Sequence, residues 1–107
     1  MARVLAISAD LLLGSKVEAM LKTAGHDVTL VSTLSDAQLG DIDLLVADLD
    51  AEDPQALAAT AIPVLGYYSH VNAETREAAE ASGIALAVPR SRMARELPTL
   101  VAKLLHA

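Results

Sequence analysis

Residues 43–50, which read Asp-Leu-Leu-Val-Ala-Asp-Leu-Asp, decide the fold of this chain. The apolar run Leu44–Ala47 has no polar residues at alternate positions, which is typical of a strand buried on both faces of a parallel sheet. Asp48 follows this run directly. Open α/β sheets build their binding sites at the carboxyl ends of the strands, so Asp48 is the first candidate site residue.

Similar apolar runs recur along the chain and alternate with helical patterns. A capping residue and a first-turn proline, Asp53 and Pro54, come before one of the short helices. The other predicted strands are Val4–Ile7, Val28–Val31, Ile62–Tyr67 and Ile84–Val88. The predicted helices are Leu11–Ala24, a short one at most in Ser35–Leu39, Gln55–Thr60, one from the cap Asn72 to about Ser82, and one from about Ala94 with Pro98 in or near its first turn.

Five strands alternating with helices predict a parallel sheet that is covered on both faces. Because crossovers are right-handed, we expect a doubly wound α/β sheet of flavodoxin-like type, with the strand order 2-1-3-4-5. The 107 residues suit a single domain, 1–107. The connection spanning 50–61 is near the lower limit of about a dozen residues for a crossover. We therefore expect a shortened third helix.

Composition narrows the classes of function. The net charge of −6 argues against binding to nucleic acid or to an anionic membrane, because both reward positive charge. The chain has no cysteine, which excludes disulfides, thiolate catalysis and thiolate metal sites. No apolar stretch approaches the roughly 20 residues of a membrane helix, and no signal peptide is recognisable. The expected location is cytoplasmic.

Several of these segments, in this order and spacing, resemble the receiver domains of two-component response regulators. They are Arg3–Ile7, Ala24–Val28, Asp43–Leu49 and Ile62–Leu65. The resemblance runs over nearly the whole chain and implies a receiver-like fold. It also places Asp48 at the position of the phosphorylated aspartate. A receiver would use Mg²⁺ as its cofactor and another signalling protein as its partner.

The sequence departs from the receiver pattern where the metal should bind. The family's acid pair after the first strand corresponds here to Ser8 and Ala9. Mg²⁺ prefers hard oxygen ligands and usually carboxylates, so Asp10 and Asp48 are weak candidate ligands and Mg²⁺ is disfavoured. Asp10 lies just beyond the pair and would reach the ion only if the loop followed another path. We therefore expect no bound cofactor.

Other receiver positions have also changed. The family's switch Ser/Thr corresponds to Tyr68, with Ser69 one residue later, and its lysine corresponds to Arg90. Tyr67 and Tyr68 point to opposite faces if the strand continues, so either one can line the site. Arginine matches a carboxylate bidentately, which leads to the hypothesis that an Asp48–Arg90 pair holds the site in one state. The alternative for Asp48 is a strand-end acid that caps the next turn.

A group of arginines follows the predicted fifth strand: Arg90, Arg92 and Arg95. It is either a patch for an anion or acidic partner, or simply a solvated loop. The resemblance also implies a docking or homodimer surface on the helix Ala73–Ser82, the fifth strand and the last helix.

Three functions remain open on the sequence alone. The first is an atypical pseudo-receiver that stands alone, without an output domain, as a non-catalytic signalling or protein-interaction module. The second is a phosphoacceptor response regulator modified on Asp48. The third is a small anion- or ligand-binding α/β domain that uses Ser8, Ser69 and Arg90. None of the three makes the chain an independent enzyme.

Overall fold

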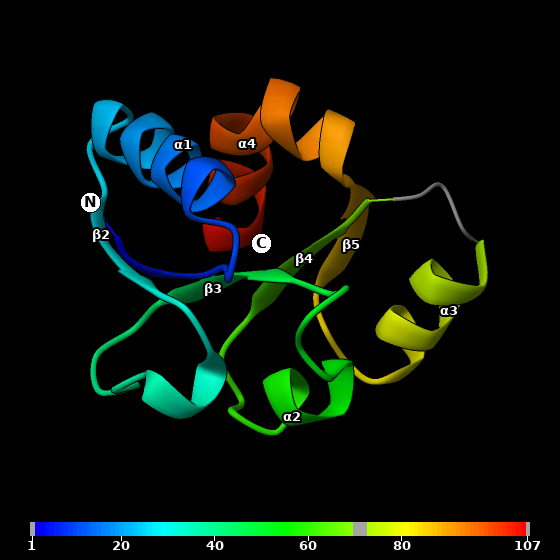
Figure 1. Cartoon of the computed structure of the whole chain (residues 1–107). Helices are drawn as coiled ribbons and strands as arrows, with labels where there is room; N and C mark the ends of the chain where they lie inside the picture. Colours follow the sequence, from blue (N-terminus) through cyan, green and yellow to red (C-terminus); the bar gives the residue numbers. More distant parts are fainter. Residues whose placement is uncertain (1, 70–72, 107) are drawn as a thin grey trace.

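The computed structural model describes residues 2–69 and 73–106 and contains a five-stranded parallel sheet with helices on both faces (Figure 1). Its strand order, β2-β1-β3-β4-β5, confirms the predicted doubly wound topology. The strands are β1 (Arg3–Ile7), β2 (Asp27–Val31), β3 (Leu44–Asp48), β4 (Val64–Tyr68) and β5 (Leu86–Pro89). The helices are α1 (Leu11–Thr23), the 3₁₀ helix η1 (Leu34–Asp36), α2 (Pro54–Ala58), α3 (Ala73–Ala81) and α4 (Arg90–Leu105).

The central strand β3 has both of its faces in the core, which explains the absence of polar alternation. Leu44 and Val46 belong to the hydrophobic core under α1 and α4. Leu45 and Ala47 belong to the core on the other side, under η1, α2 and α3 (Figure 1). All four residues are fully buried. The carboxyl end of β3 is therefore held by packing from both sides, and this positions Asp48.

The two faces of the sheet are covered unequally. On one face lie the long helices α1 and α4, of 13 and 16 residues. The other carries α3, with nine residues, α2, with five, and η1, with three. The short helix predicted between β3 and β4 is confirmed: the Asp53 carboxylate accepts a hydrogen bond from the Gln55 amide at 3.0 Å, and Pro54 occupies the first turn.

The start of the last helix differs from the prediction. α4 begins at Arg90, directly after Pro89, and not near Ala94. Pro98 therefore lies inside the helix, where it removes one backbone hydrogen bond. The helix forms nevertheless because its buried stripe begins at Met93 and continues through Leu97, Leu100 and Val101. Counting Met93 in the apolar pattern would have moved the predicted start before Ala94.

Smaller differences affect the last two strands. β4 begins at Val64, after Ile62 and Pro63, and β5 runs from Leu86 to Pro89 and not from Ile84. The predicted cap Asn72 lies outside the described residues. None of the helices within the described ranges has the length and apolar character needed to cross a bilayer.

Candidate functional site

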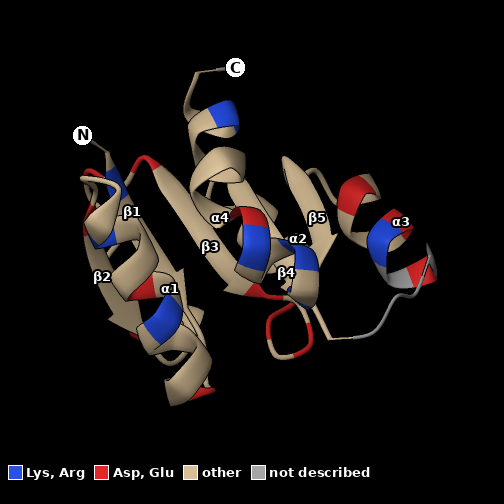
Figure 2. Cartoon of the chain, turned by 90° about the horizontal axis from the view of Figure 1, so that it is seen from above, with Lys and Arg blue, Asp and Glu red and all other residues tan. Residues whose placement is uncertain are grey.

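Polar side chains from four strands meet at the carboxyl edge of the sheet. Asp48 lies beside Tyr67, and Tyr67 beside Val88, in the strand register. Ile7 pairs with Ala47, so continuing this register by one residue places Ser8 beside Asp48. The acidic loop after β3 lies at the same edge (Figure 2). We call the residues gathered here the carboxyl-edge site: Ser8, Asp10, Asp48, Tyr67 and Arg90.

Ser8 is used by its own loop. Its side chain is only 2% exposed. The hydroxyl donates a hydrogen bond to the Asp10 carbonyl oxygen at 3.0 Å and accepts one from the Asp10 amide at 3.2 Å. Both contacts hold the turn between β1 and α1. Ser8 was predicted to line the site, and it does so as a structural group whose hydroxyl is already bonded.

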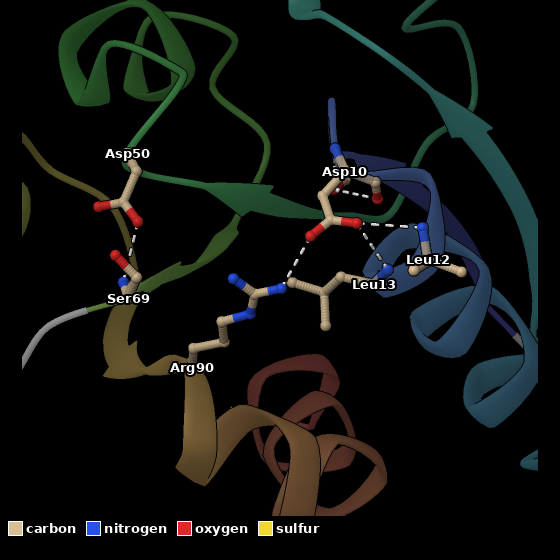
Figure 3. A network of polar contacts seen from close by, with 7 residues as sticks. Asp10, Leu12, Leu13, Asp50, Ser69 and Arg90 are labelled. Atoms are coloured by element: carbon tan, nitrogen blue, oxygen red, sulfur yellow. Dashed lines mark hydrogen bonds and ion pairs between the residues drawn. The ribbon is translucent and has the colours of Figure 1, made fainter.

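Asp10 is the N-cap of α1 and is also ion-paired. Its Oδ1 accepts hydrogen bonds from the amides of Leu12 and Leu13, at 3.0 and 3.2 Å (Figure 3). Its Oδ2 lies 2.8 Å from Nη2 of Arg90. These amide donors, Leu13 first, and the guanidinium lower the pKa of Asp10 below its ordinary value. Both carboxylate oxygens are therefore occupied by groups of the protein.

Arg90 reaches Asp10 and not Asp48, so the predicted Asp48–Arg90 pair is not formed. Arg90 is the first residue of α4 and extends toward the loop before α1 (Figure 3). Capping orients Asp10 so that its second oxygen remains available to the guanidinium. The pair joins residues 80 positions apart and connects the first turns of α1 and α4.

Asp48 is partly buried and forms no ion pair among the described residues. Its Oδ1 accepts a hydrogen bond from the Asp50 amide at 2.8 Å, so Asp48 caps the following turn, one of the roles considered above. Burial is the main cause that raises its pKa above the ordinary value, and the charges of Asp50 and Asp10 add to this effect. The Asp50 amide and Arg90 act in the opposite direction.

Tyr68 does not line the site as predicted, and Tyr67 takes its place. Tyr68 is 3% exposed and packs in the core under α2 and α3. Tyr67 lies on the other face and pairs with Asp48 in the strand register, and its buried hydroxyl has no hydrogen-bond partner within residues 2–69 and 73–106. Burial raises the Tyr67 pKa, while the neighbouring Ser8 hydroxyl lowers it without meeting hydrogen-bond geometry.

Ser69, the other predicted residue after β4, contributes through its backbone. It is exposed, and its amide donates a hydrogen bond to Oδ2 of Asp50 at 2.9 Å (Figure 3). This contact connects the loop after β3 to the end of β4. Asp50 itself lies in the turn that follows β3.

The predicted arginine patch is partly neutralised. Besides the Arg90–Asp10 pair, Arg92 pairs with Glu96 at 3.3 Å within α4. Arg95 donates to the Ser91 carbonyl at 3.4 Å. The three arginines do lie together on the first turns of α4, but two of them have carboxylate partners. This weakens the case for a strong anion site.

Two exposed leucines next to the site were not singled out from the sequence. Leu11 and Leu12 are 68% and 82% exposed and form the first turn of α1, directly after Asp10. They are the large hydrophobic side chains exposed in the described part of the chain. Because both leucines lie just outside the buried stripe of α1, the helical pattern could have identified them as exposed.

A cavity of about 490 Å³ lies away from this site, along β1 and β2. Leu5, Thr29 and Val31 form part of its wall, and Gln38 and Ile42 of the η1 crossover form another part. The three-residue η1 leaves this part of the sheet less covered than a full helix would.

Comparison with solved structures identifies the fold. A response regulator from Thermotoga maritima superposes with a TM-score of 0.87 at 14% identity, covering 100% of this chain and 99% of that one. HP1043, an orphan response regulator of H. pylori, gives 0.82 at 19% identity, with 97% and 96% covered. An atypical orphan response regulator, described as having a phosphorylation-independent regulatory mechanism, gives 0.84 at 19%, with 97% and 95% covered.

No protein-family model matches the sequence, and no curated protein matches it. The structural similarity nevertheless extends over nearly the whole chain and over proteins of several organisms. The chain has the fold of response-regulator receiver domains, as its sequence resemblance implied. The superpositions establish the fold. Because the identities are below 20%, the chemistry has to be argued from this chain's own residues.

Proposed function

We propose that this protein is a pseudo-receiver, a non-enzymatic signalling module that acts by binding another protein without being phosphorylated. Receiver domains are signalling modules, and some with this fold are orphan or atypical regulators. The neighbour with a phosphorylation-independent mechanism supports the proposal by precedent. The cytoplasm is the proposed location.

The observation that carries the proposal is the state of Asp10, the acid nearest to the missing pair. Its oxygens are occupied by the Leu12 and Leu13 amides and by Arg90. Within the described residues, no group of three acidic, histidine or cysteine side chains is placed to hold a metal ion. Asp48 and Asp50 each have one oxygen bonded to a backbone amide and one oxygen left, which is a poor match for the carboxylate-rich coordination that Mg²⁺ prefers.

Phosphoryl transfer to Asp48 would lack its main source of stabilisation. The transferring group carries negative charge that metal ions and fixed cations normally offset. Here the nearest cation, Arg90, is paired with Asp10, and Asp50 adds a second negative charge beside Asp48. These charges oppose the approach of a phosphodonor and disfavour phosphorylation of Asp48.

The Arg90–Asp10 pair favours the observed arrangement of the two helix starts. It connects the first turns of α1 and α4. A module of this kind presents a constant surface to its partner. The surface implied by the receiver resemblance, comprising α3, β5 and α4, remains a proposed site for a signalling partner or a second copy.

Intact mass after incubation with acetyl phosphate and Mg²⁺ tests the proposal. The expected result is no mass increase by a phosphoryl group in the wild type or in the Asp48→Ala variant. Stoichiometric modification that is lost in Asp48→Ala would establish the alternative, a phosphoacceptor. Stabilisation by inorganic phosphate without modification would instead support the alternative of an anion-binding domain using Ser8, Ser69 and Arg90.

A further inference from the structure

The charge balance at the carboxyl edge favours a cationic ligand. Asp10, Asp48 and Asp50 contribute three carboxylates, and Arg90 contributes one guanidinium, which leaves a net charge of −2 when all are ionised. Arg90 is bonded to Asp10, so Asp48 has no counterion within ion-pair distance among the residues that the structure describes. A partly buried carboxylate without a counterion is unfavourable. A cation bound beside Asp48 would offset the charge of this carboxylate.

The hydroxyl of Tyr67 is a second, independent indication of a ligand. Tyr67 is 2% exposed, and in the described part of the chain its hydroxyl has no partner that meets hydrogen-bond geometry, although the Ser8 hydroxyl lies beside it. Tyr67 pairs with Asp48 in the strand register, and the charges of Asp48, Arg90 and Asp10 all affect the pKa of its hydroxyl. A buried hydroxyl without a partner is costly, and its oxygen can accept a hydrogen bond from a ligand's N–H group.

The free groups match an ammonium better than a guanidinium or a metal ion. Oδ1 of Asp48 is bonded to the Asp50 amide and Oδ2 of Asp50 to the Ser69 amide, so neither carboxylate has both oxygens free and one oxygen of Asp48 remains. A planar guanidinium is best matched by two oxygens in a fork, whereas an ammonium is a compact charge with three rotatable donors. One carboxylate oxygen and one phenolic oxygen suit two of those donors.

The exposed leucines indicate that the ammonium belongs to a protein. Leu11 and Leu12 follow Asp10 on the first turn of α1 and are mostly exposed. A small free amine would leave them uncovered. A polypeptide with apolar residues beside a lysine would cover them and bury apolar area at the same time.

We propose that the carboxyl-edge site binds a lysine side chain of a partner protein, with its ammonium donating to Oδ2 of Asp48 and to the Tyr67 oxygen while apolar neighbours pack on Leu11 and Leu12. This inference rests on the proposed function, because it assigns the partner contact of the same module. The Tyr67 hydroxyl is out of contact with solvent, so binding requires a local side-chain movement.

Nitrogen–proton NMR titrations of the full chain test this inference. The probes are the peptide acetyl-Leu-Lys-Leu-amide, its arginine and glutamine counterparts, methylammonium, and tetramethylammonium, which has the charge but no N–H donor. The lysine peptide should bind most tightly, with saturable shifts at Asp48, Asp50 and Tyr67. Methylammonium should shift the same residues more weakly, and tetramethylammonium should not.

Matched variants separate the contributions of the Asp48 charge, the Tyr67 hydroxyl and the Leu12 side chain to binding. Asp48→Asn should weaken lysine-peptide binding about tenfold, and Tyr67→Phe, which removes only the hydroxyl, about threefold or more. Leu12→Ser should weaken the peptide but not methylammonium. Asp41→Asn removes the same charge from a side chain that is 86% exposed and paired only loosely with Arg3, and should change nothing.

The inference is overturned if arginine and tetramethylammonium match lysine and methylammonium, or if Asp48→Asn and Asp41→Asn have equal effects. These outcomes are independent of the phosphodonor experiment. If the chain is not phosphorylated and does not bind amines, the proposed function stands and this inference is wrong. If Asp48 is phosphorylated, the proposed function is wrong, whatever the amine titrations show.

Discussion

The ends of β1 and β3 are neighbours in the sheet, yet their polar groups are used differently. After β1, the Ser8 hydroxyl and both oxygens of Asp10 are bonded to the protein itself. After β3, Asp48 keeps one oxygen free and has no counterion. One strand end is closed by internal contacts, while the other retains a reactive group without the cation that would activate it.

This difference is the basis of the proposed pseudo-receiver, which would keep the receiver fold without its phosphoryl chemistry. The bonds that occupy Asp10 cap a 13-residue helix and join it to α4, so they support the fold. The same bonds remove the nearest acid from any metal site. In the proposed function, the stability of the β1 end and the lack of phosphorylation at Asp48 follow from the same contacts of Asp10.

Removing Asp10 should have the largest effect on stability. Asp10→Ala deletes the N-cap of α1 and the partner of Arg90, which should lower the free energy of unfolding by about 1–2 kcal/mol. Urea unfolding followed by circular dichroism measures this. Asp10→Asn keeps a capping oxygen and should cost less. Equal losses for Asp10→Ala and the exposed control Asp41→Asn would remove the special role of this strand end.

Placing an acid pair after β1 should allow this edge of the sheet to bind Mg²⁺. In the variant Ser8→Asp/Ala9→Asp, Mg²⁺ at ten times its dissociation constant should raise the free energy of unfolding by about 1.4 kcal/mol. Ser8 is buried, so Ala9→Asp alone serves as the second variant if the double one folds poorly. Thermal unfolding with and without Mg²⁺ is the measurement. No stabilisation in either variant would mean that more than the acid pair is missing.

The pH dependence should have opposite signs at the two strand ends. The raised pKa of Asp48 means that its contribution to stability is present below the ordinary carboxyl pKa and is lost as pH rises through the folded value. Asp48→Asn should therefore match or exceed wild-type stability at neutral pH. The lowered pKa of Asp10 contributes stability above the ordinary value, and this is lost as pH falls through the folded one.

Urea unfolding from pH 3 to 7 checks these signs, with both substitutions to Asn compared against the wild type. The loss in Asp10→Asn should shrink toward low pH. The gain in Asp48→Asn should shrink as well. A gain in Asp48→Asn that grows toward acid pH would contradict the account of Asp48.

The smallest effect is expected for Arg90. Its pair with Asp10 is about half exposed, and such pairs contribute about 0.2–1 kcal/mol. Arg90→Met should lower stability by that amount in low salt and less in high salt, because salt screens exposed pairs. Arg92→Met, which breaks the pair with Glu96 inside α4, is the matched control. A larger loss that salt does not change would point to packing of the Arg90 stem instead.

Local sequence patterns predicted the fold better than they predicted the site. The apolar run Leu44–Ala47 and its counterparts predicted five strands and their order, because burial on both faces leaves a clear sequence pattern. The start of α4 was misplaced because Pro98 resembles a first-turn proline. Here the apolar stripe from Met93 outweighs the helix-breaking effect of proline.

The site depended on contacts that no local pattern records. Asp48 and Arg90 were both located correctly at the carboxyl edge, but their pairing was wrong. Whether Arg90 reaches Asp48 or Asp10 depends on the orientation that capping gives Asp10. The choice between Tyr67 and Tyr68 depends on which face of β4 meets α4, which alternation alone leaves open.

The central claim is that the carboxyl edge of this sheet does not bind a divalent cation. Nitrogen–proton NMR of the wild type during a Mg²⁺ titration at constant ionic strength tests it directly. We predict no saturable shift at Ser8, Asp10 or Asp48 at millimolar Mg²⁺. Saturable shifts at these residues that disappear in Asp48→Ala would contradict the claim.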